Sequence, residues 1–188
     1  SLTSLAGLVE EDTFATAWQS APRRAVWLAI NLATALLASS VISLFQGTIE
    51  KVVALAVLMP VVASMGGIAG TQSLTILIRA MAMGQINDRN QLWLVGRESL
   101  IGLLNGILWA AVVAITASLW FNDITLGLII AAAMLINLLT AGLSGAGLPL
   151  LLQRLNIDPA LAGGVLVTTV TDIVGFLTFL GLATWCYG

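Results

Sequence analysis

The sequence predicts an all-α integral membrane protein with five membrane-spanning helices per subunit. Hydrophobic residues make up 59% of the 188 residues and charged residues only 9%, and the mean hydropathy is +1.04, which is far from the composition of a soluble domain. Five apolar stretches each reach the roughly 20 residues that a helix needs to cross the hydrocarbon of a bilayer. None of them alternates residue by residue as a membrane-spanning β-strand does.

The predicted elements follow these stretches in order. Residues 1–22 carry three consecutive acids and end before a pair of arginines, and we expect them to form an amphipathic or linker segment at the membrane surface. Residues 23–188 are expected to form the five-helix transmembrane domain. Its spans are expected at about 25–46, 51–83, 98–120, 124–152 and 160–187.

The distribution of lysine and arginine predicts the orientation. If the N-terminus is inside, the inner segments hold Arg23, Arg24, Arg79, Arg89, Arg97 and Arg154, and the outer segments hold only Lys51. Cytoplasmic segments of membrane proteins carry an excess of positive residues. The sequence therefore predicts an N-in, C-out topology in the cell (inner) membrane.

The second stretch is expected to be broken. It is longer than one span needs, and Pro60, Gly66, Gly67 and Gly70 lie near its middle. Proline removes a backbone hydrogen bond, and glycine permits unwinding or close helix contact. Broken backbone at membrane depth is tolerated where it lines a cavity or is buried in protein, so this segment is expected to line a permeation path. The alternative is a kinked helix that is packed through its glycines.

Asp172 is a carboxylate within the last apolar stretch. It lies about twelve residues into that helix, or roughly 18 Å from its start, and no fixed cation of the chain is expected at its depth. Intramembrane acids usually face a partner or a cavity, so its partner is expected to be mobile: a metal ion, Na⁺ or a proton. The alternative is a protonated carboxyl that is bonded to a neighbouring Asn or Thr.

Helical spacing places further oxygen donors beside Asp172. The predicted face consists of Gly164, Thr168, Asp172, Gly175 and Phe179. Carboxylate, hydroxyl and backbone oxygens suit hard cations such as Mg²⁺, Ca²⁺, Mn²⁺ or Na⁺. The sequence has no histidine and one cysteine, Cys186, which excludes imidazole metal sites and thiolate clusters.

Other polar residues in the apolar stretches have simpler interpretations. Asn31, Asn105 and Asn137 are expected to be buried amides that form hydrogen bonds between helices. Arg97 and Glu98 are expected to form an interfacial ion pair rather than a gate element. The five methionines are expected to be packing residues.

Two motifs carry a family resemblance. "MPVVASMGGIAGTQ" in the second stretch and "IDPALAGGVLVTTVTD" leading into the fifth make the chain resemble the transmembrane domain of the MgtE family of magnesium channels. The resemblance extends from "RRAVWLAINL" to the end. The chain departs from the usual pattern at Ile68, where the family usually has Asn, and at Gly164-Val165, where it often has a polar residue or Asn-Pro.

The resemblance implies a homodimer of five-helix subunits, with a pore between them lined by the second and fifth helices. The ion-site aspartate of the family falls on Asp172. The implied pore-lining residues are Pro60, Gly66, Gly67, Ile68, Gly70, Gln72, Thr171 and Phe179. The cytoplasmic regulatory domains of the family are absent from these 188 residues, and residues 1–22 resemble the end of the helix that would connect to them.

The expected function is uptake of Mg²⁺, with Mn²⁺ or Co²⁺ as further candidates, through a channel driven by the electrochemical gradient. An organic cofactor, a nucleic-acid partner and an enzymatic activity are not expected. A transporter that couples Asp172 to H⁺ or Na⁺ is the alternative, and a nontransporting scaffold is a further one. The lipid bilayer and a second copy of the chain are the expected partners.

Overall fold

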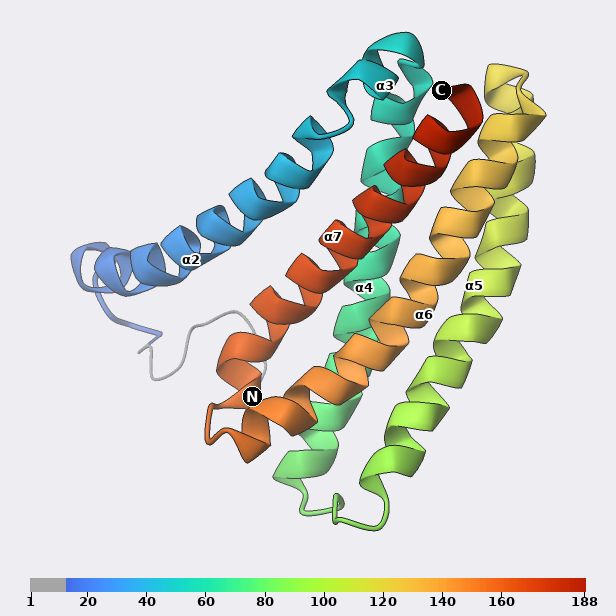
Figure 1. The fold of residues 1–188 in the computed structure, drawn as a ribbon. Coiled ribbons are helices and arrows are strands. Elements are labelled where there is room, and N and C mark those ends of the chain that lie inside the picture. The colour runs from blue at the N-terminus through green and yellow to red at the C-terminus, as the bar shows by residue number, and fades with distance from the viewer. Residues whose placement is uncertain (1–12) are drawn as a thin grey trace.

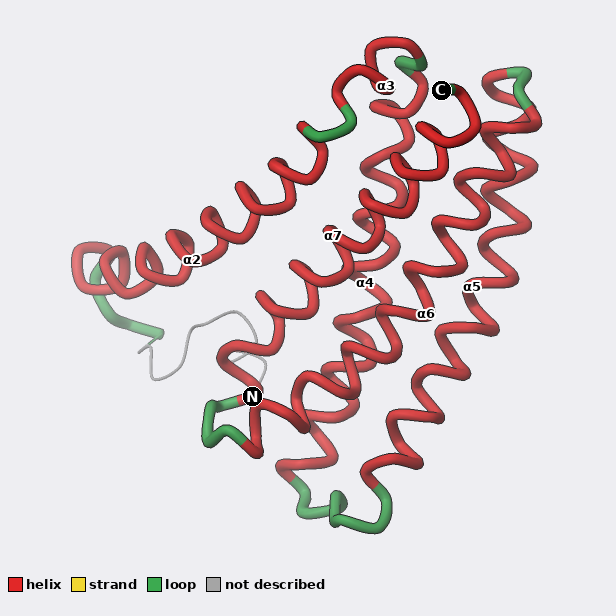
Figure 2. The backbone as a smooth tube through the Cα atoms, viewed as in Figure 1, coloured by secondary structure: helices red, strands yellow, loops and turns green. Residues whose placement is uncertain are grey.

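The computed structural model describes residues 13–188, which form long helices joined by short connections (Figures 1 and 2). The helices are α2 (Ala17–Ser43), α3 (Gln46–Lys51), α4 (Ala54–Ala82), α5 (Gln91–Phe121), α6 (Ile124–Arg154) and α7 (Pro159–Tyr187). All except α3 are long and apolar enough to cross a membrane. The prediction of an all-helical membrane protein with five spans is therefore confirmed.

Local signals set the ends of these helices. The carboxylate of Asp123 accepts a hydrogen bond from the backbone N–H of Leu126 at the start of α6, and Asp158 accepts one from Ala160 before α7. Pro159 follows Asp158 at the first helical position, where its missing N–H costs nothing. Asn122 ends α5 in the left-handed conformation, with φ of 50°, which asparagine tolerates better than most residues.

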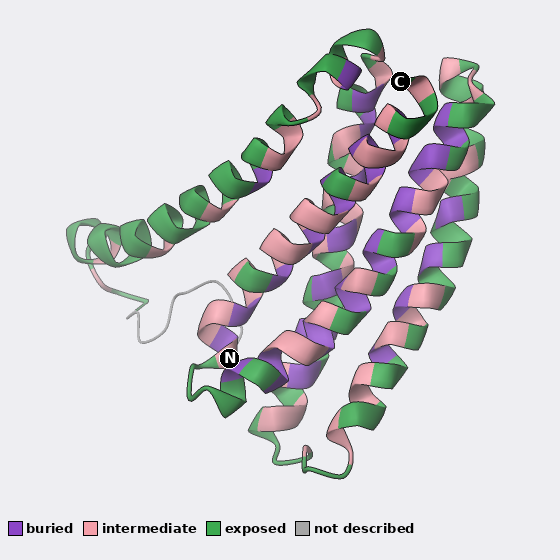
Figure 3. Cartoon of the chain, viewed as in Figure 1, coloured by how far each residue is buried: buried purple, intermediate pink, exposed green. Residues whose placement is uncertain are grey.

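Helix α6 is the centre of the bundle. It packs against α5 on one side and against α4 and α7 on the other, and it contains more buried residues than the other helices in the described part (Figure 3). Glycines allow this close packing. A side chain at Gly102 of α5 or at Gly142 of α6 would collide with the backbone of the facing helix, as small-residue contacts between membrane helices require.

Helix α2 lies apart from the bundle. Its C-terminal end, with Ala38 buried, packs against α7, while its N-terminal part leans away and is exposed almost throughout (Figures 1 and 3). Helix α2 begins at Ala17, so residues 17–22 form its first turns. Residues 1–12 of the expected linker lie outside the described residues.

The second span differs from its prediction. Helix α4 is continuous from Ala54 to Ala82, with Pro60 inside it and no interruption at residues 66–70. Pro60 removes one donor close to the start of the helix, and the glycines keep their backbone hydrogen-bonding groups. Side chains of the neighbouring helices pack directly on Gly66 and Gly70, and this packing supports a helical backbone there.

Candidate functional site

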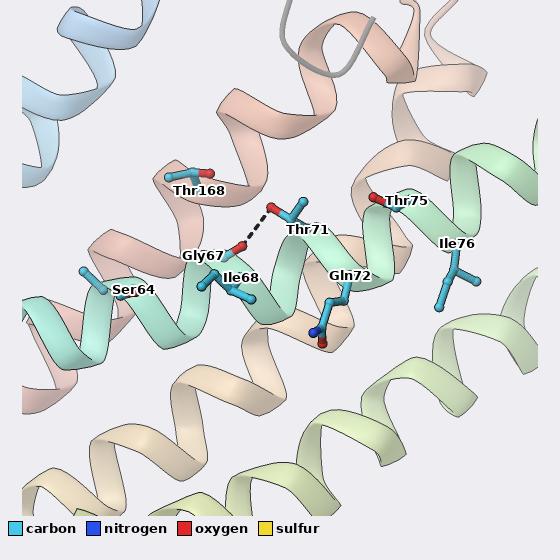
Figure 4. A pocket seen from close by; sticks show the side chains of 9 residues that line it. Ser64, Gly67, Ile68, Thr71, Gln72, Thr75, Ile76 and Thr168 are labelled. Atoms are coloured by element: carbon cyan, nitrogen blue, oxygen red, sulfur yellow. Dashed lines mark hydrogen bonds between the residues drawn. The ribbon is translucent and has the colours of Figure 1, made fainter. Parts of the chain in front are cut away.

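A wide, open groove of about 890 Å³ runs along the exposed side of α4 and is bordered by α7. Its lining residues are Ala63, Ser64, Gly67, Ile68, Thr71, Gln72, Thr75, Ile76 and Thr168. Figure 4 shows Thr71 on the side of α4 that faces α7, and Gln72 on the side that faces α5 and α6. The groove lies within the membrane-spanning part of the chain, where exposed polar side chains are unusual.

Most of the polar side chains that line the groove carry hydroxyl groups. Ser64, Thr71, Thr75 and Thr168 all line it. The Thr71 hydroxyl donates to the carbonyl of Gly67 at 2.9 Å, which leaves its oxygen lone pairs toward the groove. Thr168 Oγ1 has no hydrogen-bond partner among the described residues. These oxygens are hard donors that can hold water or a hard cation.

Asp172 lies close to the middle of α7, about 20 Å from the start of the helix. Gly175 faces Val62, and Val167 faces Gly70, so antiparallel packing puts Asp172 level with the Ser64 end of the groove. Its side chain is half-buried and makes no hydrogen bond or ion pair with any described residue. The described part of the chain holds no group of three or more acidic, histidine or cysteine side chains that could enclose a metal. An ion at Asp172 would therefore depend on water and neutral oxygens for its remaining ligands.

Only some of the predicted site residues meet at this groove. Gly67, Ile68, Gln72 and Thr168 line it, and Ile68 is 59% exposed. Gly164 is half-buried and lies one turn before Thr168 on α7. Pro60 is exposed on α4 but lies outside the groove lining.

Five predicted residues face the interior of the chain's own bundle instead: Gly66, Gly70, Thr171, Gly175 and Phe179. Phe179 is fully buried in the main hydrophobic cluster, and the hydroxyl of Thr171 is bonded to the carbonyls of Val167 and Thr168. The reason is that α7 packs against α6 as well as α4. In this structure these residues do not lie on the open face of the groove.

The asparagine prediction is correct for one residue of three. Asn137 is fully buried and donates a hydrogen bond to the carbonyl of Val62, whereas Asn31 and Asn105 are exposed in the single chain. The sequence analysis also missed Ser64, Thr71 and Thr75. The signal was available, because residues 64, 68, 71 and 75 recur at the spacing of one helix face.

Five apolar spans, with a groove among them that carries four hydroxyl side chains and one amide on a largely apolar lining, define a multi-pass helical membrane protein with polar side chains inside its spanning region. The family model for MgtE, described as a divalent cation transporter, matches residues 59–182. The chain therefore belongs to the MgtE family. The matched segment includes most of both helices that border the groove.

Curated relatives agree with this assignment. The chain is 36% identical over 176 residues to "Magnesium transporter MgtE" of Bacillus subtilis (strain 168), covering 93% of this chain and 39% of that protein. It is 31% identical over 182 residues to the protein of the same name from Enterococcus faecalis, covering 97% and 40%. The corresponding protein of Thermus thermophilus is 35% identical over 160 residues, covering 85% and 35%. The chain thus spans about two fifths of the length of these relatives.

Proposed function

We propose that this chain carries Mg²⁺ into the cell down its electrochemical gradient, along a path formed where two copies meet. Asp172 is the ion site, and Thr168, with the backbone of Gly164, holds water around the ion. The supporting observation is the position of Asp172, a carboxylate without a partner among the described residues, near the middle of a spanning helix and next to a groove that carries four hydroxyl side chains. The names of the relatives, which are magnesium transporters, support Mg²⁺ as the cation.

A second copy completes the site. In one chain the groove is open along its length. The hydroxyl groups of Ser64, Thr75 and Thr168 have no hydrogen-bond partner among the described residues and would gain none from lipid. Two copies related by a two-fold axis along the membrane normal would close their grooves into one water-filled path. Each copy would contribute one Asp172, so the ion would meet two carboxylates.

This arrangement suits Mg²⁺ because the ion gives up its water reluctantly. It is commonly bound by one or two carboxylates while it keeps several waters, and hydroxyl groups can hold those waters by hydrogen bonds. Mn²⁺ and Co²⁺ would also pass if they bind, as Mg²⁺ does, while keeping several of their waters. The driving force needs no second ion, because a divalent cation gains about 4.6 kcal/mol per 100 mV of inside-negative potential.

The test is divalent-cation flux into proteoliposomes under an imposed inside-negative potential. The wild-type chain should admit Mg²⁺, and Asp172→Asn should reduce the flux to background because it removes the charge while nearly preserving size. Asp88→Asn is the matched control, since Asp88 lies in the exposed connection between α4 and α5 and its substitution should leave flux unchanged. Wild-type flux from a folded Asp172→Asn protein would refute the ion site.

The alternative function is transport coupled to H⁺ or Na⁺, with Asp172 as the coupling site. A single unpartnered carboxylate near the middle of a span is also the expected arrangement for proton or sodium coupling. The same vesicles distinguish the two functions. Coupled transport stops when the H⁺ or Na⁺ gradient is collapsed at constant voltage, whereas channel flux continues.

A further inference from the structure

A second, smaller cavity lies between α4, α5 and α6. Its volume is about 120 Å³, and its polar lining residues are Gln72, Ser73, Arg97, Glu98 and Asn105. Helix α5 packs against α6 and barely touches α4, so helix packing does not fill the space between α4 and α5. Gln72 and Ile76 line both this cavity and the groove, which makes the two spaces neighbours across one wall.

Glu98 is the central group of this cavity. Its side chain is only 2% exposed, and it lies about 10 Å into α5. The Oε2 atom accepts a hydrogen bond from Arg97 Nη1 at 2.7 Å. No other described residue donates to Glu98, so Oε1 has no partner in the described part of the chain. A buried carboxylate with an unused oxygen has a strong requirement for a further donor or a cation.

Arg97 forms an ion pair with Glu98 that another cation can replace. Adjacent residues on a helix point about 100° apart, so the arginine must bend back to reach its neighbour. Its side chain is 46% exposed, and no described residue other than Glu98 pairs with it. The guanidinium therefore acts as a tethered cation, which can move to the surface when another cation takes its place.

We infer that the cavity is a second cation site, in which Glu98 binds a partly dehydrated divalent cation that displaces Arg97. The volume corresponds to about four waters at roughly 30 Å³ each, which leaves room for an ion with a few waters beside the carboxylate. The side-chain carbonyls of Gln72 and Asn105 supply further hard oxygens. No thiolate or imidazole lines the cavity.

The position of the cavity gives this site a place on the ion path, a step that rests on the proposed function. In the proposed orientation, Asp172 lies deeper from the cytoplasmic end than Thr168, Gln72 and Glu98. An ion that leaves Asp172 toward the cytoplasm meets Gln72, which lines both spaces, and then Glu98. Each copy would carry its own Glu98 site, unlike the shared site at Asp172.

The experiment measures how many Mn²⁺ ions bind to each purified chain. The electron paramagnetic resonance signal gives the concentration of free Mn²⁺, and the bound ions are the difference from the total. The background is Asp172→Asn, which removes the groove site. In this background one Mn²⁺ per chain should still bind, and adding Arg97→Gln should tighten binding by about tenfold because the competing cation is gone. Adding Glu98→Gln instead should abolish the remaining binding.

The double change Arg97→Gln with Glu98→Gln controls for folding. It replaces the ion pair with two neutral amides and leaves no unpaired buried charge, so this variant should fold and should bind no Mn²⁺ in the Asp172→Asn background. Retention of Mn²⁺ binding by the Glu98→Gln or double variant would overturn the inference, as would an Asp172→Asn protein that binds none. Glu98-dependent binding without any flux in vesicles would sustain this site and refute the proposed transport.

Discussion

Asn137 of α6 donates a hydrogen bond from Nδ2 to the backbone carbonyl of Val62 in α4, 3.0 Å away, and both residues are fully buried. The amide lies where α4, α6 and α7 meet, because Gly66 and Gly175 both face it. A Cβ at Gly66 would come within 2.9 Å of Asn137 Cγ, and one at Gly175 within 2.8 Å of Nδ2. One polar side chain thus fixes the spacing of the two helices that border the groove.

Gly66→Ala should therefore destabilise the protein by about 1–3 kcal/mol, the usual cost of adding a methyl group to a packed interior. The matched control is Gly67→Ala, since a Cβ at Gly67 meets nothing within 4 Å and alanine favours the helix more than glycine does. Thermal unfolding followed by helical circular dichroism in detergent should give a lower Tm for the first variant only. Equal Tm values would show that α4 and α6 are not packed in this way.

The same contacts show which parts of the site could be predicted from the sequence. The spans were predictable because long apolar runs depend on local composition alone. Asp172 was predictable because a charge within such a run stands out without any knowledge of its neighbours. Thr168 and Gly175 are seven residues apart and lie on the same side of α7. Thr168 lines the groove, yet Gly175 lies against Asn137. Which part of one helix face is covered depends on neighbouring helices far away in the sequence.

The continuity of α4 illustrates the same limit. Proline and closely spaced glycines reduce intrinsic helix propensity, which is why the sequence predicted a break. In the structure α4 stays helical through this segment. Asn137 and Val167 pack into the space that side chains at Gly66 and Gly70 would need. Gly66 and Gly70 are therefore explained by close packing of an intact helix, whereas Gly67 has open space beside it.

Thr168→Val should reduce Mg²⁺ flux by about twofold to fivefold, far less than Asp172→Asn, because it removes only a hydrogen bond to an ion-bound water. The control is Thr169→Val on the same helix. The Thr169 hydroxyl already donates to the carbonyl of Val165 at 2.6 Å and does not line the groove, so flux should be unchanged. If the Thr169 variant lost more flux than the Thr168 variant, the groove face would be wrongly assigned.

The predicted orientation is tested by reporters at two positions. A reporter inserted after Tyr187 should lie outside the cytoplasm, because six of the seven basic residues fall in the segments assigned to the inside. The same reporter inserted at Asp88, in the connection between α4 and α5, should be cytoplasmic. Alkaline phosphatase activity and fluorescence of a cytoplasm-dependent protein provide opposite readouts, and a cytoplasmic signal at Tyr187 would reverse the topology.

The contact between two copies is tested by disulfide crosslinking from single cysteines on opposite sides of α7. Cys186 is exposed and must first be changed to serine, so that each variant carries one thiol. Thr168→Cys should give dimers on mild oxidation, because Thr168 lines the groove that two copies would close. Val170→Cys is the control at nearly the same depth, since two residues along a helix turn the side chain by about 200°. Efficient crosslinking through position 170 and none through position 168 would place the contact on the other side of α7 and exclude the groove as the path between copies.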